Sequence, residues 1–255
     1  MKVPGAVNFG WKIIFTSFVF LLFCAKATAQ KKNSRIEIGA AASSFIYLGD
    51  LTPNRIGSFH TIRGGINLQR SIIINNYFLV RTNLAIGGLK GDDAKYENPT
   101  FRKQRAFNFN TPVLELSELL VWNPAGNNFT RKGFSTYLLG GVGVSFFKIK
   151  RDWSNFNAAY YGSSSDLTNR IAIDSVHSLP AITPVFPIGI GFRYALSTSI
   201  LLNAEYSFRL LFSDYLDGFS QAANADRGDR YQTISIGIIY RLGNKNRLGC
   251  PVIKL

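Results

Sequence analysis

Hydrophobic and polar residues alternate with a period of two in eight separate stretches of the chain. This alternation is typical of β-strands whose two faces meet different surroundings. The last three stretches are the clearest, and in the final one Ile234, Ile236 and Ile238 alternate with glycine or hydroxyl-bearing residues. The pattern predicts eight strands of about ten residues or more, the length that a tilted strand needs to cross a bilayer. They cover residues 35–48, 61–69, 78–87, 114–122, 135–146, 186–196, 200–210 and 233–242.

The composition of the two faces distinguishes a membrane barrel from a soluble one. The polar face consists mainly of Gly, Ser, Thr and Asn with isolated Arg and Glu, which suits a crowded, hydrogen-bonded interior. The apolar face is bulky, with Tyr and Trp near several strand ends, as in lipid-facing girdles. We therefore predict an all-β fold, an eight-stranded antiparallel transmembrane β-barrel of the outer-membrane type. The alternative is a soluble β-sandwich or lipocalin-like barrel, whose polar face would carry many Lys, Glu and Asp side chains.

The lengths of the connections predict the orientation of this barrel. Those after the second, fourth and sixth strands are short, at Asn75-Asn76, residues 123–132 and Ser197-Thr198. The other connections are longer, and residues 148–184 form the longest. Bacterial barrels have short periplasmic turns and long extracellular loops. An even number of strands then places both the N- and C-termini in the periplasm, together with a basic tail of residues 243–255.

The N-terminus has the features of a secretory signal peptide. Lysines precede an apolar run of residues 13–24, and Ala27-Thr28-Ala29 matches an A-x-A cleavage site. We predict that residues 1–29 are removed and that residues 30–242 form one barrel domain. The two alternatives are a retained membrane anchor, for which the run is short, and acylation of Cys24.

The net charge limits the choice of partner. The chain carries 29 Lys and Arg residues against 15 Asp and Glu, a formal net charge of +14. Such a surplus can indicate nucleic-acid binding, but no nucleic-acid motif accompanies it in this exported chain. We expect outer-membrane lipid or an acidic protein as the partner and no nucleic acid. Cleavage would leave Cys250 as the single thiol, so the fold must hold without an internal disulfide bond.

An eight-stranded barrel is just wide enough for its own side chains, so we do not expect a wide aqueous pore. The alternation directs charged side chains inward at Arg35, Glu37, Arg63, Arg81, Glu115, Arg193, Glu205, Arg209 and Arg241. Buried charges are costly unless they are paired and hydrogen-bonded. We predict that arginines neutralise the three glutamates in a sealed, plug-like ion network. A proton or ion path, or a gate, is the functional alternative. On the apolar face, Glu118 breaks the pattern.

Residues that could carry chemistry are few. Ser58 and His60 are near Asp50 in the sequence, but no nucleophile motif surrounds them. A zinc site needs three or four ligands, and nothing is clustered in that way. Asp214 and Asp217 do not have the spacing of a calcium-binding loop. We predict a protein that is not an enzyme, with no catalytic residues, cofactor, metal or small-molecule substrate.

Five short segments, taken in order, resemble a known family. They are Tyr47-Leu48-Gly49-Asp50-Leu51, Glu115-Leu116-Ser117, residues 137–144, residues 187–194 and Phe212-Ser213-Asp214-Tyr215-Leu216-Asp217. Together they resemble the PorG-like outer-membrane β-barrel family, which is associated with the type IX secretion system. The resemblance covers most of the mature chain, and the Tyr-Leu-Gly-Asp-Leu and Asp-Tyr-Leu-Asp segments are its more specific parts. It implies a non-enzymatic barrel whose periplasmic side contacts a ring of secretion proteins.

Two classes of function remain open. The first is a structural or assembly component that docks a periplasmic secretion machine to the outer membrane. The second is a surface-exposed barrel whose long extracellular loops bind a ligand or another cell. An enzyme acting on lipid is a more distant third class. The side of the membrane that carries the partner distinguishes the first two.

Overall fold

The computed structural model of the protein describes residues 36–53, 57–129, 132–162, 165–211, 215–223 and 228–242. The predicted signal peptide, the tail of residues 243–255, Arg35 and Asp214 lie outside these ranges. One antiparallel sheet contains the strands β1 (Ile36–Leu48), β2 (Arg63–Ile73), β3 (Phe78–Asp92), β4 (Asn108–Trp122), β5 (Gly133–Phe147), β6 (Lys150–Asp152), β7 (Ile182–Ala195), β8 (Ile200–Leu211) and β9 (Arg230–Leu242).

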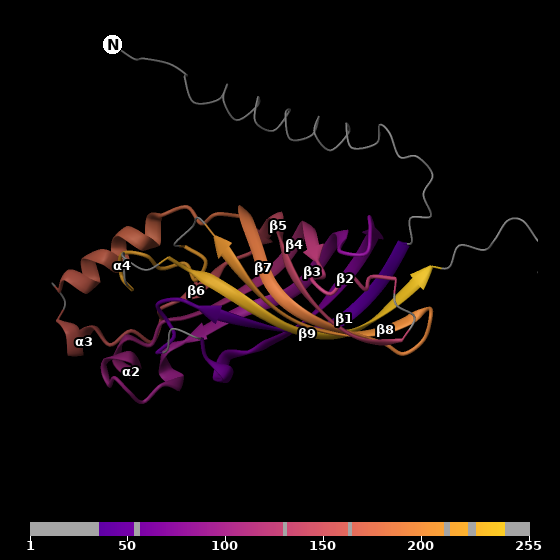
Figure 1. Cartoon of the computed structure of the whole chain (residues 1–255). Helices are drawn as coiled ribbons and strands as arrows, with labels where there is room; N and C mark the ends of the chain where they lie inside the picture. The colour runs from indigo at the N-terminus through magenta and orange to yellow at the C-terminus, as the bar shows by residue number, and fades with distance from the viewer. Residues whose placement is uncertain are drawn as a thin grey trace, which may run out of the picture. The chain divides into compact units, whose positions relative to one another are not determined.

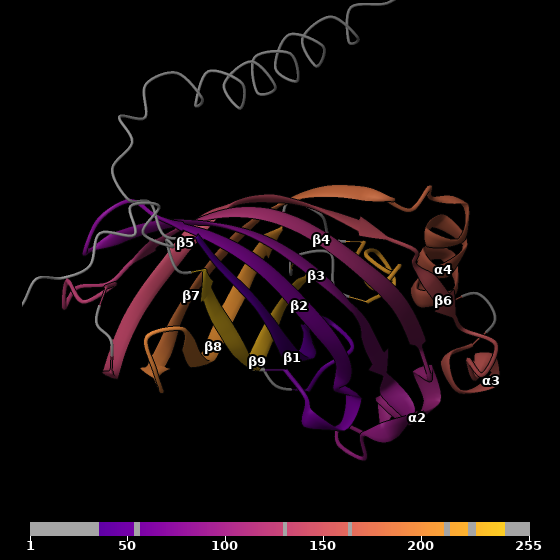
Figure 2. The same ribbon diagram turned by 90° about the vertical axis from the view of Figure 1, so that its right-hand side faces the viewer.

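Eight of these strands close into a ring, which Figures 1 and 2 show from two sides. Each strand pairs with its neighbours in the order β3-β2-β1-β9-β8-β7-β5-β4, and β3 pairs with β4 over its whole length. The short strand β6 only adds to the end of β4, at residues 108–110. The predicted eight-stranded antiparallel barrel is therefore confirmed.

The two ends of the barrel differ in their connections. Residues 74–77, 123–132 and 196–199 join strands at one end, which we call the short-turn end, and Ile36 pairs with Leu242 there. The opposite end, called the helical end, carries short helices (Figure 1). These are η1 (Phe59–Thr61), η2 (Asp93–Lys95), α2 (Phe101–Arg105), α3 (Ala158–Tyr161) and α4 (Asp166–Val176). The alternation of short and long connections follows the prediction, whereas the helices within the long connections were not predicted.

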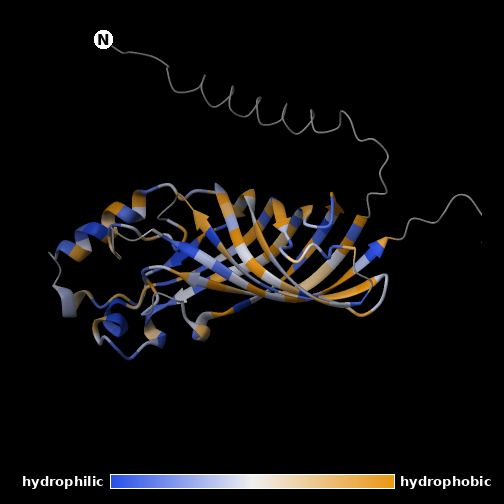
Figure 3. Ribbon diagram, viewed as in Figure 1, coloured by the Kyte–Doolittle hydropathy of each residue, from blue (hydrophilic) through white to orange (hydrophobic). Residues whose placement is uncertain are grey.

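The polarity of the barrel wall is inverted relative to a soluble protein. Along β9, Ile236 is 68% exposed on the outside, whereas Ser235 is 3% exposed and points inward. The same alternation runs along the other seven strands of the ring, and hydrophobic positions recur along the strands in Figure 3. A closed barrel with bulky apolar side chains outside and polar ones inside suits contact with lipid rather than water. The soluble sandwich is therefore excluded as the fold.

The largest cluster of buried aromatic side chains among the described residues lies at the helical end. Phe45, Tyr47 and Tyr231 from the strands pack with Phe107 and Phe219 from the connections. The rings of Phe107 and Phe219 stack with centroids 4.4 Å apart. This cluster holds the connections against the strand ends. None of the helices in the described ranges has the length and apolar character needed to cross a membrane.

Candidate functional site

The barrel interior contains three buried ion clusters, and the first lies toward the helical end. Glu115 on β4 accepts hydrogen bonds from Arg209 Nε on β8, at 3.0 Å, and from the Tyr231 hydroxyl on β9, at 2.6 Å. Arg209 Nη1 also donates to the hydroxyl oxygens of Ser207 and Thr233. All five side chains are buried. One carboxylate therefore joins three strands across the interior.

The second cluster is centred on Glu205 of β8. Arg81 Nη1 on β3 donates to Glu205 Oε2 at 2.6 Å, and the Tyr137 hydroxyl on β5 donates to the same oxygen at 2.7 Å. The guanidinium carbons of Arg81 and Arg193 lie 5.2 and 4.9 Å from the centroid of the Tyr137 ring. These distances suit cation–π contacts, so the ring connects two arginines and the carboxylate.

The third cluster lies toward the short-turn end. Glu37 on β1 accepts hydrogen bonds from Arg241 Nε on β9, at 3.0 Å, and from Arg193 Nη1 on β7, at 3.4 Å. A cavity beside Arg193, Arg241 and Asn128 has a volume of about 10 Å³, the space of about one water molecule. Side chains therefore fill the interior at this level.

Every described member of the predicted network lies in one of these three clusters, except Arg63. Arg63 is exposed at the helical end of β2 and has no ion pair among the described residues, so its predicted place in the network is wrong. The pairing of β1 with β2 stops at this residue, so its side chain lies at the rim of the wall. Sequence reasoning missed Tyr137 and Tyr231, although they share the inward parity of the charged positions.

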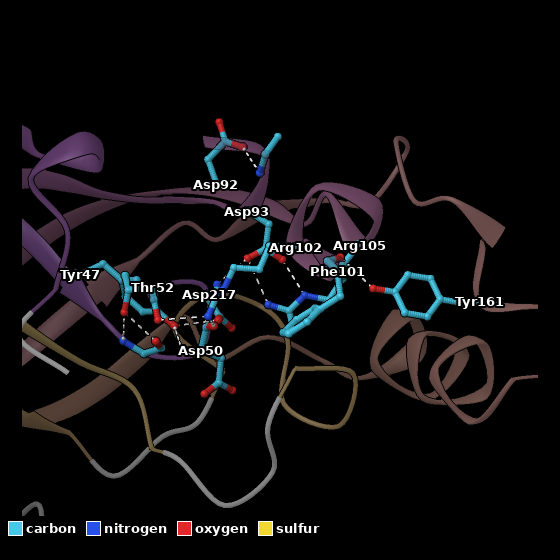
Figure 4. Close-up of polar contacts among 12 residues, drawn as sticks. Tyr47, Asp50, Thr52, Asp92, Asp93, Phe101, Arg102, Arg105, Tyr161 and Asp217 are labelled. Atoms are coloured by element: carbon cyan, nitrogen blue, oxygen red, sulfur yellow. Dashed lines mark hydrogen bonds and ion pairs between the residues drawn. The ribbon is translucent and has the colours of Figure 1, made fainter. Parts of the chain in front are cut away.

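At the helical end, the two more specific of the five resembling segments meet. The Tyr47 hydroxyl lies 2.7 Å from Asp217 Oδ2 and 2.5 Å from Asp229 Oδ1, and it accepts a hydrogen bond from the backbone N–H of Asp50. Tyr47, Asp50 and Asp217 lie close together in Figure 4. The backbone N–H groups of Leu216 and Asp217 donate to Asp229 Oδ2 at 2.9 and 3.2 Å. We call Tyr47, Asp50, Asp217 and Asp229 the cap cluster.

The geometry and burial of the cap cluster favour a proton on one of its carboxyl groups. Tyr47 has a single hydroxyl hydrogen for two carboxyl groups, and a proton on one carboxyl supplies the second contact with a hydrogen of its own. Burial raises the pKa of Asp229 well above its usual value, and the charge of Asp217 raises it further. Gly49 lies against Tyr47 and Asp229, and a Cβ at this position would overlap the Tyr47 hydroxyl and the Asp229 carboxyl. A glycine is therefore required at that position.

The other described residues of these two segments pack within the helical end. Leu51 and Leu216 are buried in the aromatic cluster at the helical end, and Leu48 is also buried. The Tyr215 ring stacks on the ring of His177 with centroids 4.0 Å apart. Asp214 belongs to the same segment but lies outside the described residues.

A second buried carboxylate joins the cap cluster to α2 (Figure 4). Asp93 accepts hydrogen bonds from Arg102 Nη1 at 2.8 Å and from Arg105 Nε at 2.5 Å. Arg102 Nη2 donates to the backbone oxygens of Asp50 and Thr52, both at 3.2 Å. The connection after β1 is thereby fixed to the connection between β3 and β4. No periodic signal in the sequence indicates these contacts, because they form within and between irregular connections.

The helix α4 is fixed to the rest of the helical end in a similar way. Its first turn is capped by the Ser165 hydroxyl, which accepts a hydrogen bond from the backbone N–H of Thr168. Near its C-terminal end, Asp174 is buried and accepts hydrogen bonds from the backbone N–H groups of Ser220, Gln221 and Ala222. Hydrogen bonds therefore hold the described part of the longest connection against the connection between β8 and β9.

The candidate chemical residues are engaged in local contacts. Ser58 Oγ accepts a hydrogen bond from the backbone N–H of His60 at 3.2 Å, as the N-cap of η1. The ring of His60 stacks on Tyr96. Among the described residues, no three His, Cys, Asp or Glu side chains are grouped as a metal site requires.

Comparison with known sequences identifies the family. The model of a family described as a domain of unknown function, DUF6089, matches residues 12–245. The chain belongs to this family. A search of curated protein sequences finds no match.

Several solved outer-membrane proteins have similar chain folds. Ail, the attachment invasion locus protein of Yersinia pestis in complex with the heparin analogue sucrose octasulfate, is 15% identical over 83% of this chain and 100% of its own, with a TM-score of 0.44. Neisserial surface protein A is 12% identical over 81% and 97%, with a TM-score of 0.45. OprG from Pseudomonas aeruginosa is 14% identical over 83% and 96%, with a TM-score of 0.43.

Proposed function

We propose that the protein is an outer-membrane β-barrel with a structural role, which docks a periplasmic secretion assembly to the membrane, as the resemblance to PorG-like barrels implies. Its partners are outer-membrane lipid around the apolar wall and the ring proteins of the secretion machine at the periplasmic end. The three buried ion clusters support a structural role rather than transport, because paired side chains fill the interior.

The observation that carries this proposal is a set of asparagines at the short-turn end. The buried Asn123 and Asn128 join the turn of residues 123–128 to the turn of residues 74–77. The backbone N–H of Asn123 donates to Tyr77 O at 2.7 Å, and Asn128 Nδ2 donates to Asn75 O at 3.0 Å. We call these two turns the asparagine platform.

The asparagine platform is also fixed to the barrel interior. Arg241 Nη2 donates to the backbone oxygen of Asn128 at 3.0 Å, while Arg241 Nε holds Glu37 in the third ion cluster. A surface that is already rigid loses little conformational entropy when a partner binds it. This supports a docking role for the short-turn end, which the loop lengths predict to be periplasmic.

The proposal can be tested by adding bulky charge to either end of the barrel. Asn76 and Ala125 are exposed on the asparagine platform, and neither side chain forms a hydrogen bond or ion pair with another described residue. The N76R/A125R variant should lower the recovery of periplasmic secretion components after cross-linking in intact outer membranes. The matched control, A172R/V176R, places the same charges on exposed positions of α4 and should leave recovery unchanged. If neither variant, or only the control, lowers recovery, the docking proposal fails.

The ordered helical end favours a surface-binding barrel as the second candidate. Asp93 and Asp174 hold its connections in place, and large apolar side chains remain exposed there, including Phe59 at 72% and Val176 at 85%. Apolar side chains presented by a rigid frame are common in binding surfaces. Under this function, A172R/V176R is the variant that abolishes binding to cells or ligands.

A further inference from the structure

Two charged residues stand on the outside of the barrel wall, within its apolar band. Arg70 on β2 and Glu118 on β4 have the outward parity of Leu68 and Leu120, and both are exposed. Neither forms an ion pair with another described residue. If the wall faces lipid, as proposed above, both charges lie in a medium where an unpaired charge is unfavourable.

Register places the two charges on either side of one threonine. Arg70 pairs with Thr82 of β3, and Thr82 pairs with Glu118. Strands in a sheet are about 4.8 Å apart, so Arg70 and Glu118 are separated by about 10 Å with Thr82 between them. The flanking positions in this row, Ile38 and Val142, are apolar. We call Arg70, Thr82 and Glu118 the polar row.

The polar row is not at the edge of the wall. Thr82 and Glu118 are each four residues from the pair Phe78 and Trp122, which ends the ladder at the short-turn end. Four residues of a strand tilted by about 40° rise about 10 Å along the membrane normal. Since the apolar band of such barrels is about 25 Å tall, the polar row lies near the middle of the bilayer rather than among the headgroups.

The wall around the polar row is hollowed. A groove of about 410 Å³ is lined by residues of β1, β2 and β3 that include Leu68, Arg70 and Thr82. A second groove of about 460 Å³ lies further toward the helical end, where Gly64 and Gly88 leave space on β2 and β3. The glycines of the second groove leave room for another protein surface to approach closely.

We propose that this face binds a second copy of the same chain, with a two-fold axis along the membrane normal that passes near Thr82. Such an axis brings Arg70 of each copy opposite Glu118 of the other, because a two-fold interface places residue i against j and j against i. Under this rotation the polar row of one copy is complementary in charge to the polar row of the other, and the dimer forms two reciprocal ion pairs. The tilt of the strands offsets each pair by about 6 Å along the normal, which the long side chain of arginine spans.

The first test detects the contact at the axis. In a C250S background, Thr82→Cys should give a cross-linked dimer with a short bis-maleimide in native outer membranes. Ala204→Cys is the control, because Ala204 points outward from β8, which is four strands from β3 in either direction around the ring. Dimer from T82C alone supports the proposal, whereas monomer from both variants, or equal dimer from both, overturns it. Heat-dependent gel mobility of each variant confirms that the barrel is folded.

The second test distinguishes a second copy from bound lipid. R70E and E118R should each lower the T82C cross-linked fraction at least about tenfold, because like charges then face each other across the axis. The double variant R70E/E118R restores both ion pairs and should recover the wild-type fraction. If Arg70 instead binds a lipid phosphate, E118R has no effect and the double variant stays as low as R70E, which overturns the proposal. If the two residues pair within one barrel, none of the three variants changes the cross-linked fraction, and this also overturns it.

Discussion

Replacing Glu115 by Gln tests whether the interior ion clusters stabilise the barrel. The fully buried Glu115 accepts hydrogen bonds from Arg209, Tyr231 and Ser117. Glutamine has the same size, but it removes the negative charge and turns one acceptor oxygen into an NH₂ group that faces donors. The E115Q variant therefore leaves Arg209 buried without its counter-charge.

The expected loss of stability follows from what Arg209 retains. Removing one partner of a buried ion pair costs about 3–5 kcal/mol. Arg209 Nη1 keeps the hydroxyl oxygens of Ser207 and Thr233 as acceptors, so the loss should lie near the lower limit, at about 3 kcal/mol of unfolding free energy. The matched control is E118Q, the same substitution three residues along β4 on the outer face. At a lipid-to-protein ratio that keeps the barrels monomeric, it should change the unfolding free energy by less than about 1 kcal/mol or raise it, since it then removes an unpaired charge from the apolar wall.

Urea unfolding of the barrel in phospholipid vesicles, followed by tryptophan fluorescence and by gel mobility, measures both changes. Adding R209M to E115Q should recover much of the lost stability, because a buried ion pair can be replaced by apolar side chains with little cost. If E115Q unfolds within about 1 kcal/mol of the wild type, or as readily as E118Q, the interior clusters do not stabilise the fold as argued.

Three further predictions address the wall, the cap cluster and the orientation. Ile236→Arg, on the outer face, should destabilise the barrel by about 2–4 kcal/mol in vesicles if it lies near the bilayer midplane, and tolerance of this arginine would indicate contact with water instead. Because the pKa of Asp229 is raised in the folded state, its contribution to stability is complete below the unfolded carboxyl pKa of about 4 and is lost as the pH rises through the folded pKa. Unfolding curves of Asp229→Asn should lack this decline, and an unchanged pH profile would contradict the shared proton. In a C250S background, an impermeant maleimide should label Val176→Cys on intact cells and Asn76→Cys only after the envelope is opened, and the reverse pattern would invert the predicted orientation.

The barrel was predictable because its wall follows a local rule. Every second residue points the same way, so the alternation around Ile236 gives both the strand and the face, and it also directs Glu37, Glu115 and Glu205 inward. The same rule misplaced Arg63, because parity gives the direction of a side chain but not the height at which the wall ends.

The helical end was not predictable in the same way. Asp174 bonds to backbone N–H groups of another connection, whereas Asp93 and Asp229 bond partners within their own connections, and no period relates any of these partners along the chain. The meeting of Tyr47 with Asp217 likewise joins residues 170 positions apart. The resemblance marked both segments without indicating that they touch. Contacts of this kind depend on the complete fold rather than on the local sequence.

The ion pair between Glu37 and Arg241 has a consequence for the order of assembly. These residues face each other across the pairing of the first and last strands of the barrel, and they are 204 positions apart. Until β9 arrives, β1 and β8 have unpaired edges, and Glu37 lacks one of its two arginines. Synthesis and export must deliver the final strand before this charge is satisfied and the edges are closed. A chain truncated before β9 should therefore remain with its insertion machinery or be degraded, rather than accumulate as a nearly complete barrel.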